Sequence, residues 1–95
     1  MTKNGYSVVR IHVGSPTRRR LDLLDRARRQ ADYLGPHGFR AKRRQTNRRY
    51  RRDGYLRLKF PTRRLARAYI ARLADLHEPG IRWQLMRNSG RYREW

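Results

Sequence analysis

The sequence contains no cysteine, which excludes disulfide bonds and metal sites built from thiolates. It also lacks any apolar run close to the roughly 20 residues that a membrane-spanning helix needs. Acidic residues are scarce, with seven against 26 lysines and arginines, and they do not cluster as the carboxylates of a metal-dependent nuclease do. We therefore expect a protein with no metal, no other cofactor and no membrane partner.

Lysine is scarce as well. Only three of the 26 cations are lysines, so 23 are arginines, and the formal net charge at pH 7 is +19. A compact chain of this charge repels itself, and a polyanion relieves that repulsion. Arginine pairs bidentately with phosphate and stacks on bases. The composition favours a nucleic acid as the partner and leaves RNA and DNA both open.

The length of 95 residues suits one domain with one small core. We expect residues 1–95 to form a single basic nucleic-acid-binding domain with flexible tails at 1–5 and 88–95. The first residues, Met1 to Tyr6, lack the apolar core of a signal peptide, so we expect a cytoplasmic location.

The densest positive charge lies between residues 40 and 52, where no residue is acidic. Eight residues there are cationic: Arg40, Lys42, Arg43, Arg44, Arg48, Arg49, Arg51 and Arg52. The dipeptide Asp53-Gly54 follows, and it favours a turn with positive φ. We expect a strand from Phe39 to about Arg44 and an arginine-rich hairpin over 43–52, with its tip at 45–47, that contacts phosphates.

Residues 55–60 alternate strictly between polar and apolar. Leu56, Leu58 and Phe60 point to one side of a strand, and the residues between them point to the other. Similar alternation predicts strands at 6–13 and 81–86, with Trp83 in the core. One face of the sheet then collects the outward residues Arg10, His12, Arg40, Lys42, Tyr55, Arg57, Lys59, Arg82 and Gln84.

Two helices are expected between these strands, near 16–34 and 63–77. Ser15 or Thr17 can cap the first helix and Thr62 the second. The order is therefore β-α-β-β-α-β. With right-handed crossovers, this order folds as an α+β ferredoxin-like sandwich, a four-stranded antiparallel sheet with two helices on one face. In that fold the strands at 6–13 and 55–60 are neighbours.

Two segments resemble signatures of the RNA-recognition motif, which has this topology. They are Ile11–Pro16 and Asp53–Phe60. The resemblance implies that Tyr55 stacks on a base and that His12 takes the place of a first-strand aromatic residue. The chain departs from the family at Arg57, where a second stacking aromatic is usual, and at Asp53, where a cation is usual. The resemblance favours RNA or single strands slightly.

Other resemblances compete. The segment 38–73 is similar to the arm-binding domains of phage-type integrases, which implies three strands and a helix that bind duplex DNA. Residues 43–52 resemble the arginine-rich RNA-binding peptides of retroviruses and phages, which order on binding. A small inhibitor that binds an acidic partner protein is a further alternative.

Catalysis is the remaining alternative. A metal-independent ribonuclease could use His12, His37 or His77 as a base, with cations stabilising the phosphate. No two of these histidines share an obvious face in the predicted sheet, and none has an acid placed to orient it. We therefore expect a binding protein and not an enzyme.

Overall fold

The computed structural model describes residues 7–34 and 43–86, which form an α+β fold. In these ranges there are three strands, three α-helices and a short 3-10 helix: β1 (Ser7–His12), α1 (Arg18–Arg29), η1 (Gln30–Leu34), α2 (Arg43–Asp53), β2 (Leu56–Phe60), α3 (Arg63–Asp75) and β3 (Arg82–Leu85). The tails expected at 1–5 and 88–95 lie outside the described residues.

The strands form one antiparallel sheet in the order β2-β1-β3. Val9 of β1 lies opposite Leu58 of β2 and Leu85 of β3. This confirms the predicted pairing of the first strand with the strand that follows Gly54. The central place of β1 brings the side chains of all three strands into common rows.

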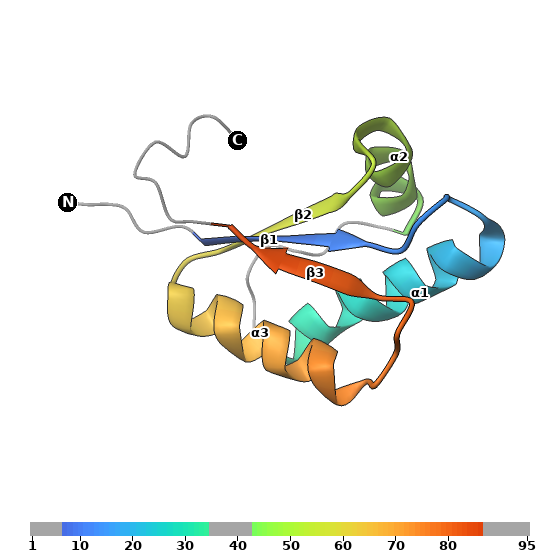
Figure 1. The fold of residues 1–95 in the computed structure, drawn as a ribbon. Helices are drawn as coiled ribbons and strands as arrows, with labels where there is room; N and C mark the ends of the chain where they lie inside the picture. The colour runs from blue at the N-terminus through green and yellow to red at the C-terminus, as the bar shows by residue number, and fades with distance from the viewer. Residues whose placement is uncertain (1–6, 35–42, 87–95) are drawn as a thin grey trace.

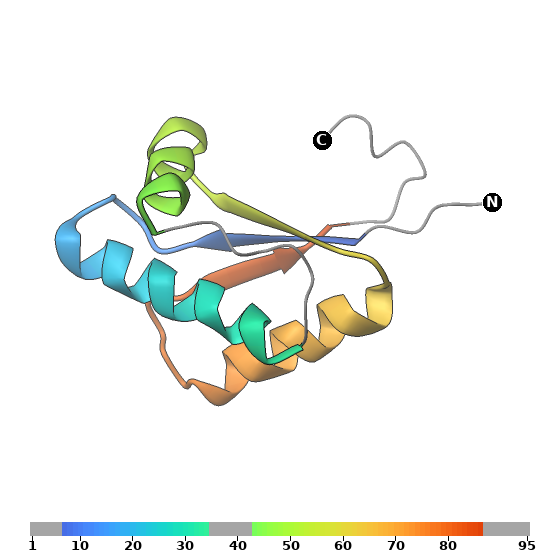
Figure 2. The ribbon, with the colours of Figure 1, turned by 180° about the vertical axis from the view of Figure 1, so that it is seen from behind.

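One face of this sheet packs on helices. α1 and α3 lie together beneath it, as both views show (Figures 1 and 2). The core contains alternate strand residues and the apolar stripes of the two helices: Val9, Ile11, Leu56, Leu58, Phe60, Leu21, Leu24, Ala27, Ala66, Tyr69 and Leu73. We call the opposite face of the sheet, which α1 and α3 leave uncovered, the open face.

Tyr69 joins the two core helices. It is fully buried, and its hydroxyl donates a 2.6 Å hydrogen bond to the carbonyl of Ala27 in α1. Its ring lies 5.1 Å from that of Phe60. Burial raises the pKa of the Tyr69 hydroxyl above its ordinary value, so the group remains a donor.

The helix starts follow the predicted caps. Thr17 Oγ1 accepts a hydrogen bond from the amide of Arg20, and Thr62 Oγ1 accepts one from the amide of Leu65. Of the two caps considered for the first helix, Thr17 is the one used. Regular α-helix ends at Arg29, and η1 continues the predicted helix to Leu34.

The hairpin predicted at 43–52 is wrong, because Arg43–Asp53 is the helix α2. This segment has no glycine or proline and is rich in arginine, a good helix former. Gly54 has the expected positive φ of 82°, but it ends a helix: its amide donates to the Tyr50 carbonyl. Arg44 is thus helical, and the rest of the strand predicted from Phe39, residues 39–42, lies outside the described residues.

α2 stands at the end of the sheet where β1 ends and β2 begins. In both views it rises on the side of the open face, away from α3 (Figures 1 and 2). It contacts β2 and also α1. The expected four-stranded sheet is therefore a three-stranded one in the described ranges, with a helix in place of the predicted hairpin.

Trp83 is less buried than predicted. Its side chain points to the helix side, as its pairing with Ile11 requires, but it is 36% exposed. Within the described residues β3 is an edge strand, so one side of each of its residues has no neighbouring strand there.

No helix in ranges 7–34 and 43–86 has the length and apolar character needed to cross a bilayer.

Candidate nucleic-acid interface

The open face gathers cationic side chains from all three strands. Arg10 of β1 lies between Arg57 of β2 and Gln84 of β3. In the next row His12 lies opposite Arg82. Opposed residues of an antiparallel pair have Cβ atoms about 5 Å apart on the same face. Six predicted site residues are thus brought together: Arg10, His12, Tyr55, Arg57, Lys59 and Arg82.

Tyr55 is the predicted stacking platform, and two neighbours already contact its ring. The guanidinium carbon of Arg10 lies 4.5 Å from the ring centroid, a cation–π distance. The ring of His12 is 5.8 Å away and tilted by 51°. Arg10 therefore covers one face of the tyrosine, and a base that stacks on that face must displace the guanidinium.

The arginines of α2 separate into two groups around the helix axis. Arg44, Arg48 and Arg51 are exposed and, at about 100° per residue, fall within about 60° of one another. We call these three residues the outer stripe. Thr46 and Tyr50 occupy the opposite side and are buried. Of the other predicted cations, Arg43 begins α2, whereas Arg40 and Lys42 lie outside the described residues.

Tyr50 anchors α2 to the rest of the protein. Its ring is 2% exposed, and its hydroxyl donates a 2.6 Å hydrogen bond to the Gly14 carbonyl. The same oxygen accepts a 2.9 Å bond from the Val13 amide. One side chain thus ties the arginine helix to the segment between β1 and α1. The sequence signal for this anchor is the i, i+4 spacing of Thr46 and Tyr50, which the hairpin prediction leaves unused.

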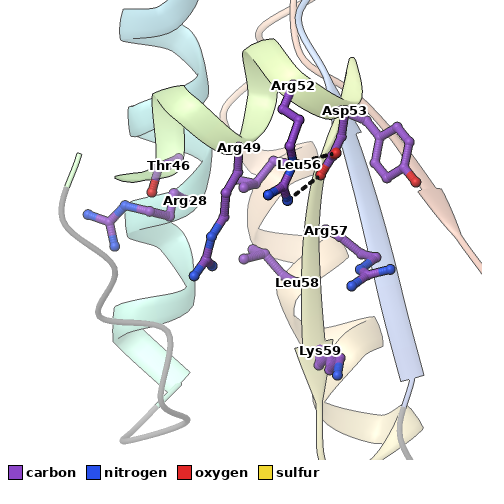
Figure 3. A pocket seen from close by; sticks show the side chains of 10 residues that line it. Arg28, Thr46, Arg49, Arg52, Asp53, Leu56, Arg57, Leu58 and Lys59 are labelled. Atoms are coloured by element: carbon purple, nitrogen blue, oxygen red, sulfur yellow. Dashed lines mark hydrogen bonds and ion pairs between the residues drawn. The ribbon is translucent and has the colours of Figure 1, made fainter. Parts of the chain in front are cut away.

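Arg49 and Arg52 lie on a different side of α2, toward β2 (Figure 3). Arg52 pairs with Asp53 through two hydrogen bonds of 2.9 and 3.1 Å. The hydrogen bond from Arg52 lowers the pKa of the Asp53 carboxyl, and the same bond raises the pKa of Arg52. Arg52 is therefore partly neutralised, whereas the outer stripe has no acidic residue within its span of the helix.

Two of the three histidines considered for catalysis, His12 and His77, lie within the described residues, in different surroundings. His12 contacts Tyr55 on the open face, whereas His77 follows the end of α3 and lines a hollow with Leu73 of α3 and Trp83 of β3. His37 lies outside the described residues. Within ranges 7–34 and 43–86, no three His, Asp or Glu side chains lie close enough together to hold one metal ion.

The predicted cations that the structure describes thus occupy two surfaces, the open face and α2, with Tyr55 on the open face. Comparison of the chain with protein-family models, with curated proteins and with solved structures found no significant match.

Proposed function

We propose that this protein is a non-catalytic nucleic-acid-binding protein that contacts phosphates through the outer stripe of α2 and the open face. The observation that carries this proposal is the outer stripe itself. Three exposed arginines share one side of a helix whose opposite side is anchored by Tyr50. A phosphate backbone supplies the negative charges that this part of α2 lacks, and arginine binds phosphate bidentately.

The open face is a second cationic surface. It adds Arg10, Arg57, Lys59 and Arg82 on the side of the sheet where α2 rises (Figures 1 and 2). Tyr55 lies among these cations and has a face for a base once Arg10 moves aside. Cations around one aromatic ring suit a single strand, whose bases are free to stack. RNA or single-stranded DNA is therefore the favoured ligand.

A duplex is the second candidate, and the helical state of α2 favours it. A major groove admits an α-helix, and α2 presents its arginines along one exposed side. On this alternative the outer stripe carries the affinity, and Tyr55 is a packing residue of the open face.

We also propose that the sheet is ferredoxin-like. In a ferredoxin-like sheet the first strand lies between the third and the fourth, and β1 lies between β2 and β3 in the corresponding way.

Filter binding to single-stranded RNA, duplex RNA and duplex DNA of one sequence tests the function. If about six phosphates are neutralised, log K falls against log salt with a slope of about −4 on a single strand and about −5 on a duplex. A slope near zero on all three ligands rejects the proposal. Tighter binding to the single strand supports the sheet as platform, and tighter binding to a duplex supports α2 as a groove-binding helix.

A further inference from the structure

A hollow of about 430 Å³ lies between α2 and the outer edge of β2, with α1 on its third side (Figure 3). The side chains of β2 alternate in direction along this edge: Leu56 and Leu58 point toward α1, and Arg57 points the other way (Figure 3). The hollow is lined by Arg28, Thr46, Arg49, Arg52, Asp53, Tyr55, Leu56, Arg57, Leu58 and Lys59.

The charge of this lining is strongly positive. Five of its side chains are cationic and one is acidic. The guanidinium of Arg49 extends between α1 and β2, and that of Arg52 is held in place by Asp53 (Figure 3). The lining combines these cations with two leucines, the mixture that ligand sites of this size have. Such a site suits an anionic group attached to a body with apolar surface.

Thr46 supplies an independent sign of a ligand. The residue is 1% exposed, yet its hydroxyl has no hydrogen-bond partner in the part of the chain that the structure describes. In Figure 3 this oxygen points from α2 toward Arg28, at the margin of the hollow. A buried hydroxyl without a partner costs free energy, and an oxygen of a bound anion removes that cost.

The hollow is separate from the outer stripe. Arg49 lies about 140° around the axis of α2 from Arg44, so a strand that follows the outer stripe does not reach the hollow along its length. Tyr55, Arg57 and Lys59 of its lining also belong to the open face, so an internal phosphodiester, the end of a strand or a free molecule can each reach it. Internal phosphodiesters carry one negative charge each, whereas a terminal phosphate carries about −1.5 to −2 and three acceptor oxygens, as a phosphorylated side chain does.

We propose that this hollow binds a phosphate monoester, with Arg49 and the Thr46 hydroxyl as donors to its oxygens. Two sources carry this chemistry: the phosphorylated end of a nucleic-acid strand and a free mononucleotide. The first source rests on the proposed function, and the second does not.

The direct probe is adenosine 5′-monophosphate titrated into the ¹⁵N-labelled full chain at constant ionic strength, with adenosine as the matched control. We expect amide shifts at Thr46, Arg49 and β2 with the monophosphate, smaller shifts with adenosine, and none specific to the outer stripe. Arg49→Gln should weaken this binding about tenfold, and Arg19→Gln, at an exposed position of α1 outside the hollow, should leave it within about twofold. Thermal melts of both variants check that they fold. Absence of shifts in the hollow would falsify the inference.

The second arm uses one oligonucleotide with a 5′-phosphate, a 3′-phosphate or hydroxyls at both ends, and a hydroxyl-ended oligonucleotide one residue longer. We expect one phosphorylated end to tighten binding about tenfold, and Arg49→Gln to abolish that gain. If the longer oligonucleotide gains as much, the strand-end source is rejected. Monophosphate binding in the hollow without any oligonucleotide binding rejects the proposed function and assigns a free mononucleotide. Salt-dependent oligonucleotide binding without any monoester preference rejects the hollow alone.

Discussion

The helices α1 and α2 each contain six arginines, and the protein uses them differently. α1 also contains Asp22 and Asp25 and buries an apolar stripe against the sheet. α2 contains one acid, Asp53, at its last position, and its buried side chains are Thr46 and Tyr50. One helix is part of the core, and the other is attached to it.

The acidic residues of α1 neutralise part of the positive charge of that helix. Asp25 is 4% exposed and forms ion pairs with Arg29 at 3.0 Å and Arg28 at 3.6 Å. Arg28 also lies 3.8 Å from Asp32 of η1. The outer stripe of α2 contains no such acids in its span. The number of arginines in a helix therefore says less about its partner than the position of the acids near them.

The largest expected effect separates these two helices. Arg44→Gln, Arg48→Gln and Arg51→Gln combined should weaken nucleic-acid binding about 100-fold near 0.1 M salt and reduce the salt slope by 2 to 3, since about three phosphate contacts are lost. Filter binding across a salt series measures both quantities.

The matched control removes the same charge from exposed positions of α1, by Arg18→Gln, Arg19→Gln and Arg26→Gln. It should change affinity by about threefold or less, because these arginines attract the ligand only through the net charge of the protein and make no direct contact with a phosphate. Equal losses for the two triple variants would mean that net charge alone attracts the ligand.

The anchor of α2 gives the next largest effect. Tyr50→Phe removes the hydroxyl that bonds Val13 and Gly14 and leaves the buried Val13 amide and the partly buried Gly14 carbonyl without that partner. We expect unfolding free energy to fall by about 2 kcal/mol in urea denaturation. The control Tyr33→Phe, at a residue 68% exposed, should change it by less than about 0.5 kcal/mol. A silent Tyr50→Phe would show that packing of the ring alone holds α2.

Tyr55 tests whether the open face contributes beside α2. Tyr55→Ala should cost about 1 kcal/mol on a single strand, the low end for a base–aromatic stack, because Arg10 must leave the ring first. The cost on a duplex of the same sequence should be much less, and Tyr55→Phe should be nearly silent on both. Equal losses of affinity on the single strand and the duplex would reject base stacking on Tyr55 and leave α2 as the main binding site.

The smallest expected effect concerns the one acid of α2. Asp53→Asn removes a negative charge and releases Arg52, so affinity for nucleic acid should rise about threefold. Arg52 lowers the pKa of Asp53, so the carboxylate loses its charge only at a pH below the range in which an ordinary carboxyl titrates. The difference between Asp53→Asn and the parent chain should therefore be constant from pH 5.5 to 8. A difference that disappears within this range would contradict the assigned pair.

Most of the sheet was predictable because strict alternation has one structural meaning. The spacing of Leu56, Leu58 and Phe60 identifies a strand and its buried side, and the caps Thr17 and Thr62 locate two helix starts. The same alternation correctly placed Arg10, His12 and Arg57 on one face. These patterns involve only residues close together in the chain, so the sequence alone is enough to recognise them.

The segment 43–53 was not predictable in this way, because it has no apolar stripe to reveal a period. Nine of its residues are charged or carry side-chain amides, a composition that suits a helix, a hairpin or an arm. What selects the helix is contact with distant residues: Tyr50 bonds to Val13 and Gly14, more than 30 positions earlier. The hollow arises for the same reason, since α1, α2 and β2 form its walls only after packing. By itself the sequence determined the charge, the strands and two helices. Tertiary structure decided how the arginines of α2 divide between its outer side and the hollow, because a helix with little apolar surface takes its orientation from the few residues that anchor it.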